Sequence, residues 1–109
     1  MVKNNFLVST TDEIAGKKVI EVLGICKGST VRSRNIGRDI GAAFKNLVGG
    51  EIVTYTEMAN NARDEAFNRM INNAMEMGAN AVVGMRFSTS MIMQGASEMV
   101  AFGTAVKIK

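Results

Sequence analysis

The chain has 109 residues, which is enough for one domain. Hydrophobic residues make up 47% of it and charged residues 21%, a composition typical of a globular protein and not of a disordered chain. The formal charge of +3 is too small to indicate a dedicated nucleic-acid binder, so we do not expect a nucleic-acid partner. One cysteine excludes an internal disulfide framework, and the absence of histidine excludes Ser-His-Asp and Cys-His arrangements within one chain.

The N-terminal region predicts a short strand and a turn. Residues 1–13 hold no apolar run long enough for a signal peptide or a membrane span, so we expect a cytoplasmic protein without a membrane partner. The apolar Phe6–Thr10 favours a strand, and Thr11–Glu13 favours a turn. Gly16 closes this loop before the next strand begins.

Residues Lys18–Thr30 predict a long strand with two apolar faces. One face would carry Val19, Leu23 and Ile25, and the other Ile20, Val22, Gly24 and Cys26. A sheet that is covered by helices on one side normally leaves its other side polar. The strand is therefore either central and covered twice, or its second face contacts another subunit; we favour the subunit.

Residues Arg32–Val48 predict a first, shorter helix. Apolar residues recur there at helical spacing: Ile36, Ile40, Ala43, Phe44, Leu47 and Val48. Gly37 and Gly41 each weaken this helix by about 1 kcal/mol relative to alanine. Gly49 and Gly50 are expected to separate it from the next helix.

The chain is organised around Thr54–Val83, where a second, long helix leads into a buried strand. Glu57–Met77 contains neither proline nor glycine, and its apolar residues form one stripe: Met58, Ala59, Ala62, Ala66, Phe67, Met70, Ile71, Ala74 and Met77. Thr54 or Thr56 can cap the start of the helix, and Gly78 stands where a left-handed C-terminal cap is expected.

The C-terminal third predicts a β-hairpin. Strands Ala81–Met93 and Glu98–Ile108 would be joined around Gln94–Ala96 by a loop of four to five residues. In the second strand, Val100, Phe102, Val106 and Ile108 would point to one face, and Met99, Ala101, Gly103 and Ala105 to the other. The order of elements predicts an α+β fold in which an antiparallel sheet carries two helices on one face.

Four segments resemble the YbjQ-like family of small bacterial proteins. They are NIGRDI at residues 35–40, VGGE at 48–51, GANAVVGM at 78–85 and GTAV at 103–106, and the resemblance runs over essentially the whole chain. It implies a β-α-β-β, dodecin-like fold with extra short strands, a single domain over residues 1–109, and assembly as a homopentamer. The family is labelled as heavy-metal-binding, but the resemblance supplies no ligand residues.

Catalysis is not expected, because the usual general base near neutral pH, histidine, is missing. The adjacent carboxylates Asp12/Glu13 and Asp64/Glu65 are typical of solvated surface positions. Asp39 and Glu51, which lie close to glycines, are the remaining carboxylates of interest, and Asp39 is expected to pair with a nearby arginine.

A metal site would depend on soft sulfur ligands. Met91 and Met93 put two thioethers on one face of a strand, a spacing that suits Cu(I), although methionine is also a common filler of cores. Cys26 lies on an apolar strand face, where a buried small hydrophobe is the simpler interpretation. One cysteine per chain cannot build a tetrahedral thiolate site, so a metal at Cys26 would need several subunits.

An anion site is the alternative. Lys27, Arg32, Arg34 and Arg38 cluster around the start of the first predicted helix, where free N–H groups could hold a phosphate. No phosphate-binding loop is present and no aromatic residues are interleaved, so intersubunit or solvated ion pairs are the simpler interpretation. We therefore expect a non-enzymatic, self-assembling binding protein for a soft or heavy metal, and as the alternative an interaction module that presents this basic patch to an anionic partner.

Overall fold

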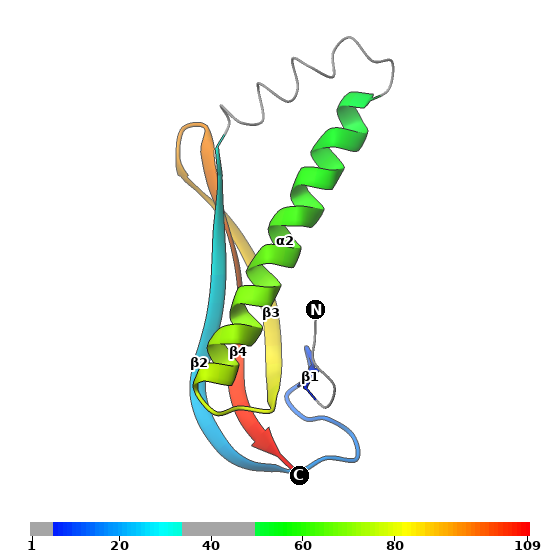
Figure 1. Ribbon diagram of the computed structural model, residues 1–109, viewed down its shortest axis with the longest axis vertical. Helices are drawn as coiled ribbons and strands as arrows, with labels where there is room; N and C mark the ends of the chain where they lie inside the picture. The colour runs from blue at the N-terminus through cyan, green and yellow to red at the C-terminus, as the bar shows by residue number, and fades with distance from the viewer. Residues whose placement is uncertain (1–5, 34–49) are drawn as a thin grey trace.

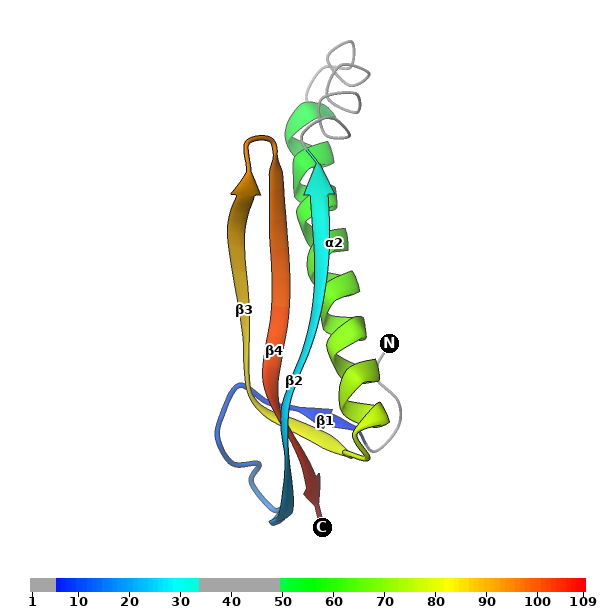
Figure 2. The same cartoon turned by 90° about the vertical axis from the view of Figure 1, so that its left-hand side faces the viewer.

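A computed structural model describes residues 6–33 and 50–109 of the chain. Its elements are β1 (Leu7–Val8), β2 (Val19–Ser33), α2 (Gly50–Glu76), β3 (Ala81–Met93) and β4 (Ala96–Ile108). The strands form one four-stranded sheet in the order β1-β3-β4-β2, and α2 crosses one face of it (Figures 1 and 2). The predicted α+β class is confirmed in this arrangement.

Two predictions about the sheet need correction. β1 is only two residues long and pairs with β3 in parallel, so the sheet is mixed and not antiparallel throughout. The β3–β4 hairpin is present, but Met93 pairs directly with Ala96, which leaves the two-residue turn Gln94–Gly95 in place of a longer loop. Gly95 has a φ of 84°, and this left-handed conformation allows such a tight turn.

The long helix is confirmed and extends further than predicted. α2 begins at Gly50, so this glycine starts the helix and does not separate two helices. Its end agrees with the prediction: Gly78 has a φ of 93°, its N–H donates to Met75 O at 2.9 Å, and Ala79 N–H donates to Ala74 O at 3.0 Å. These two bonds form a Schellman motif, which pairs carbonyls that the helix end would leave without partners.

Only one helix lies in the described part of the chain, whereas the sequence predicted two. Arg32 and Ser33, expected to begin the first helix, are the last two residues of β2. β-branched residues and pairing with β4 extend this strand past Thr30, as far as the partners Ser33 and Ala96. The remainder of the first predicted helix, residues 34–48, lies outside the described residues.

β2 is an edge strand, and its two faces differ from the prediction. A β-bulge between Val22 and Gly24 inserts one extra residue, which reverses the alternation that a regular strand would have. As a result Leu23 packs on the core beside α2, together with Cys26, while Ile25 is 76% exposed. The predicted alternation of β4, in contrast, is confirmed, because Ala101 and Ala105 face α2 while Val106 and Ile108 lie on the other face.

The core has two parts on opposite faces of the sheet. The larger part lies between α2 and the sheet and includes Cys26, Ala66, Met70, Ile71, Ala74, Val82, Met85, Ala101 and Ala105. The smaller part is formed by Ala81, Val83, Val106 and Ile108. Ile14 from the loop that joins β1 to β2 and Val19 from the start of β2 pack on it. This loop thus covers the lower end of the face that α2 leaves open, which we call the outer face.

α2 approaches β2 more closely than a side chain would permit. A Cβ atom at Gly28 would lie 2.6 Å from the carbonyl carbon of Arg69, and closer still to Met70 N and Ala66 O. At the same crossing, Asn73 Oδ1 accepts the backbone N–H of Lys27 at 2.9 Å, and Arg69 Nη1 donates to Ser29 O at 2.6 Å. Backbone groups at the edge of the sheet are therefore bonded by side chains of the helix.

The described surface retains many large apolar side chains. Ten are exposed: Leu7, Ile20, Val22, Ile25, Val31, Phe87, Met91, Ile92, Met93 and Phe102. The molecule measures 54 × 27 × 20 Å, and its radius of gyration of 16.9 Å exceeds the about 13 Å expected for a compact domain of about 100 residues. Figure 1 shows the cause: α2 and the β3–β4 hairpin diverge towards the upper end, so the hairpin tip stands clear of the helix.

We predict that Gly28→Ala lowers the free energy of unfolding, at the upper end of the about 1–3 kcal/mol typical of overpacking. The added methyl group would meet the helix backbone, which cannot move aside as a flexible side chain can. Urea denaturation followed by circular dichroism measures the change, and Ser29→Ala in the same strand serves as the control. An unchanged midpoint for Gly28→Ala would contradict the close packing.

Candidate functional site

The structure places Cys26 beneath α2. Its side chain is 0% exposed, and the thiol donates a weak hydrogen bond to Gly103 O at 3.6 Å. Burial raises the pKa of the Cys26 thiol above its ordinary value, so the thiolate that binds metals is disfavoured there. In this fold the thiol contacts the helix-side core, and another subunit could not reach it without displacing α2.

Met91 and Met93 lie near the tip of the β3–β4 hairpin, 75% and 66% exposed. The prediction that they share one strand face needs correction, because a register shift between them places them opposite the adjacent residues Ser97 and Ala96 of β4. The structure does not bring them together with Cys26. Cys26 is opposite Gly103 on β4, and Met91 is opposite Ser97, so six residues of β4 separate them, or about 20 Å along the strand. Within the described part of the chain, no three His, Cys, Asp or Glu side chains are grouped as a metal site would require.

The predicted basic cluster is described only in part. Arg34 and Arg38 lie outside the described residues, as do Asp39 and the side chain of Glu51. Lys27 is exposed on β2 and stands opposite Phe102 of β4. Arg32 is bound within the molecule: its Nη1 donates to Thr30 Oγ1 at 2.6 Å and lies 3.4 Å from Glu65 Oε1.

Glu65 is the centre of a charged cluster where α2 meets β2. Thr30, which is buried, donates its hydroxyl hydrogen to Glu65 Oε1, and Arg69 Nη2 lies 3.2 Å from the same oxygen. The hydrogen bond from Thr30, followed by the charges of Arg69 and Arg32, holds the pKa of Glu65 below its usual range. This cluster stabilises the helix–strand contact, and it neutralises the arginines that could otherwise hold an anion.

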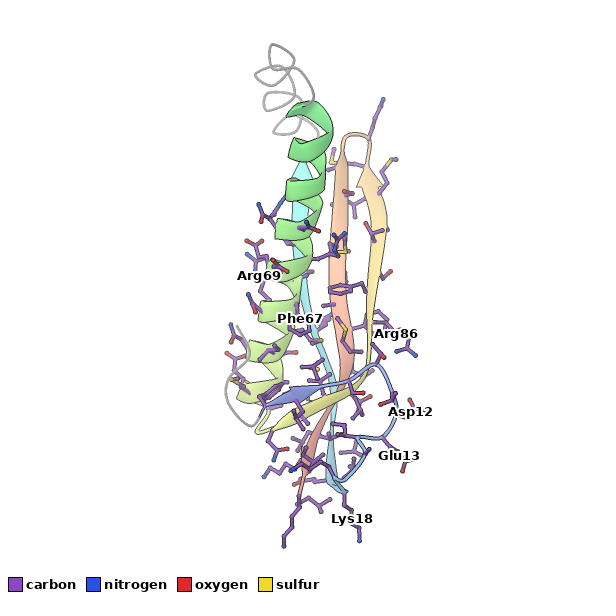
Figure 3. The ribbon with its side chains drawn as sticks, turned by 90° about the vertical axis from the view of Figure 1, so that its right-hand side faces the viewer. Asp12, Glu13, Lys18, Phe67, Arg69 and Arg86 are labelled. Carbon is purple, nitrogen blue, oxygen red and sulfur yellow. The ribbon has the colours of Figure 1, made fainter. Side chains whose placement is uncertain are left out.

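A cavity of about 530 Å³ opens between the β1–β2 loop and the outer face of the sheet. Valines from three strands form its apolar floor: Val19 and Val22 of β2, Val83 of β3 and Val106 of β4. Its remaining lining is Asp12, Glu13, Ile14, Lys17, Lys18, Gly84 and Thr104. Figure 3 shows Asp12 and Glu13 at the side of the loop and Lys18 at the lower end of the molecule.

The loop that closes this cavity is held in place by hydrogen bonds to β3. Ser9 N–H donates to Val82 O at 2.9 Å, and the N–H groups of Met85 and Gly84 donate to Ser9 O and Thr11 O at 3.0 and 2.9 Å. Arg86 Nη1 donates to Thr10 O at 2.7 Å. The cavity is therefore formed in advance of any ligand, and its volume lies within the range of small-molecule sites.

Sequence reasoning missed this cavity. It treated Asp12 and Glu13 as a solvated carboxylate pair and did not connect them with the lysines that precede β2. The one available signal was the cluster of polar residues and Gly16 between two apolar strands, which predicts a loop but not the face that the loop covers. The floor could not be found because it joins residues from three strands, and bulges in both β2 and β3 shift the register between them.

The fold and surface define a small α+β protein with one long helix on a mixed sheet, a preformed cavity on the outer face and an exposed pair of thioethers. Residues 6–109 match the model of the YbjQ family, whose description reads "Putative heavy-metal-binding". The chain therefore belongs to this family. No helix of the described part combines the length and apolarity that crossing a membrane would require.

Relatives cover nearly the whole chain. A UPF0145 protein from Thermosipho africanus is 54% identical over 103 residues, which is 94% of this chain and 95% of that protein. Another, from Clostridium perfringens, is 57% identical over 100 residues, 92% of this chain and 94% of that protein. A UPF0145 protein from Methanosarcina acetivorans is 49% identical over 102 residues, 94% of this chain and 96% of that protein.

A solved structure shares the fold. It is the crystal structure of a protein with unknown function from Pediococcus pentosaceus that belongs to the DUF74 family. The two structures superpose with a TM-score of 0.63 at 15% identity, over 95% of this chain and 98% of that one. At this identity the comparison establishes the fold and nothing about the ligand.

The charged cluster yields a prediction about pH. Because the pKa of Glu65 is lower in the folded state than in the unfolded state, its contribution to stability is present above the unfolded-state pKa and is lost as the pH falls through the folded-state pKa. In Glu65→Gln the free energy of unfolding should therefore decrease less than in the wild type as the pH falls below about 4.5. Urea midpoints between pH 3 and 7 measure this, with Glu76→Gln on the same helix as the control. If Glu65→Gln lost as much stability at low pH as the wild type does, the prediction would be contradicted.

Proposed function

We propose that this protein is a non-catalytic binding protein that assembles as a homopentamer and binds a soft metal ion at Met91 and Met93, repeated by the symmetry of the ring. The observation that supports this proposal is the placement of both thioethers on the free tip of the β3–β4 hairpin, where they are largely exposed. A cytoplasmic location, where Cu(I) is the stable copper ion, is part of the proposal.

The proposal of assembly is supported by the apolar surface. A small domain buries a limited fraction of its surface, and contiguous exposed apolar side chains usually mark an interface. Within the described residues, β1 and the β1–β2 loop bond the outer edge of β3 by backbone hydrogen bonds only as far as Met85. The rest of this long strand carries Phe87, Met91 and Met93 beside an unpaired edge, and natural proteins seldom leave such an edge exposed to solvent.

Thioethers suit the family description better than the other side chains described. Methionine sulfur is a soft ligand that selects Cu(I), and a ring would bring several hairpin tips, each with two thioethers, into one site. Cys26 would be a further soft ligand, but its burial beneath α2 and its raised pKa both disfavour metal binding. The Met91–Met93 pair therefore has the leading role in the proposal, and the chain, which has no histidine, is given no catalytic step.

A second candidate is an interaction module for an anionic partner. The exposed ammonium group of Lys27 favours it, because Arg32 is already paired with Glu65. This candidate predicts retention on an anionic matrix that salt reverses and that Lys27→Ala weakens, with Lys18→Ala as a control of equal charge. Arg34 and Arg38 would extend the same patch.

Native mass spectrometry and anaerobic Cu(I) titration test the leading proposal. We expect native mass spectrometry to show five subunits. We also expect the affinity for Cu(I), measured in competition with bicinchoninate, to fall at least tenfold in the double variant Met91→Leu/Met93→Leu. Met99→Leu, a partly buried methionine on β4, is the matched control, and Cys26→Ser should leave the affinity unchanged. A monomer would contradict the proposed assembly. A pentamer whose Cu(I) affinity is unchanged by the double substitution would contradict the proposed metal site.

A further inference from the structure

The outer face of the sheet is open above the cavity. Residues directly opposite one another on neighbouring strands share a face, and Val106 of β4 lies on the outer one. Their partners on β2 include Ile25 and Val31, which are 76% and 51% exposed. Alternation along β4 places four more of its side chains on this face: Thr104, Phe102, Val100 and Glu98. Figure 2 views this face, with the strands in front of α2, and no described helix or strand covers its upper part.

Charges of opposite sign lie on the two sides of Val100. Glu98 is two residues nearer to the hairpin tip. Phe102 is two residues farther from it, between Lys27 of β2 and Arg86 of β3, which stand directly opposite Phe102. Each step is about 7 Å along the strand. Neither Glu98 nor Lys27 forms an ion pair with another described residue, so both charges can be used by a partner.

We infer that a second copy of this chain packs on this face in antiparallel orientation, about a two-fold axis that crosses the strands at Val100. Such an axis reverses the strand direction, so Glu98 of each copy faces Phe102 of the other and the two cations beside it. An axis parallel to the strands would instead set Glu98 against Glu98 and Lys27 against Arg86, which places like charges together. Packing of the apolar side chains supplies the attraction, and the charges select the antiparallel orientation.

The antiparallel arrangement also gives the cavity an occupant. Thr104, which lines the cavity, is four residues from Val100 in one direction, and Ala96 beside the hairpin turn is four residues from it in the other. The two-fold axis therefore brings the hairpin tip of each copy to the cavity of the other. Met93 is opposite Ala96 and 66% exposed, and it would meet the partner's Val83, the β3 residue opposite Thr104. The β1–β2 loop would then flank the tip.

The contact is small. From Ala96 to Thr104 the three strands present about 27 by 14 Å, or about 400 Å² per copy. A stable interface buries about 800 Å² per partner, so the pairing should depend on protein concentration. It goes beyond the proposed ring, because it joins two rings, or two monomers if no ring forms. Met93 also belongs to the proposed metal site, so the pairing is tested with a Cu(I) chelator present.

Sedimentation equilibrium of the full-length protein tests the pairing. The mass should double as the concentration is raised, from five to ten subunits if the proposed ring forms and from one to two if it does not. Glu98→Lys should raise the dissociation constant of this doubling at least tenfold, because two like-charge contacts replace two attractive ones. Glu76→Lys, the same charge change at an exposed position of α2, should leave it unchanged. A mass that never doubles, or a doubling that Glu98→Lys does not weaken, would overturn the inference.

Mixing two variants tests the antiparallel orientation. Lys27→Glu alone should also weaken the doubling, because Glu98 then faces one carboxylate and one cation. In an equimolar mixture of Glu98→Lys and Lys27→Glu, one contact of each mixed pair keeps the wild-type charges. The mixture should therefore pair more tightly than either variant alone, which also shows that both variants are folded. A mixture that pairs no better than Lys27→Glu alone would overturn the antiparallel arrangement.

A disulfide between copies tests the seating of the hairpin tip. Gln94→Cys/Glu13→Cys should form a covalent dimer on mild oxidation, because the tip of one copy lies beside the loop of the other. The two positions of one chain lie at opposite ends of the outer face, beyond the about 7 Å between Cα atoms that a disulfide allows. Cys26 is buried and takes no part. Gln94→Cys/Glu76→Cys is the control, and equal dimer yields for the two variants would overturn the seating.

Discussion

The fold depends on the contact between the backbone of α2 and Gly28 of β2. At this position the helix approaches a sheet edge so closely that any side chain would collide with it. The approach brings Asn73 and Arg69 into hydrogen-bonding distance of the β2 backbone, and it brings Glu65 to Thr30 and Arg32. One glycine thus allows the helix to bury its apolar stripe and to satisfy part of an open edge at the same time.

The position of α2 determines which parts of the sheet it covers and which parts it leaves open. Because the helix covers β2 and diverges from the hairpin, the upper part of β3 and the outer face receive no cover from it (Figures 1 and 2). The β1–β2 loop covers the lower end and leaves a cavity there; the upper end retains exposed phenylalanine and methionine side chains. The proposed pentamer interface and the proposed metal site therefore share the upper part of β3, which α2 leaves open, while the cavity lies at the lower end.

Local signals in the sequence predicted most of the elements. The uninterrupted helical stripe and Gly78 located the end of α2, and the bounds of β3 agreed with its apolar pattern. The faces of β2 could not be predicted, because two bulges, at Val19–Glu21 and Val22–Gly24, interrupt its alternation. The candidate ligands were assigned by residue type alone, and burial then separated Cys26 from Met91 and Met93. The cavity depends on cross-strand register, which no local pattern specifies.

Amide hydrogen exchange at Lys27 tests the helix–edge contact most directly. Its N–H lies on an edge strand, yet it donates to Asn73 Oδ1 at 2.9 Å, so it should exchange slowly. Asn73→Ala should speed its exchange by about fivefold or more, as expected for the loss of one hydrogen bond, while Asn72→Ala, the exposed neighbour, should not. Fast exchange at Lys27 in the wild type, or a rate indifferent to Asn73, would contradict the account that α2 holds this edge.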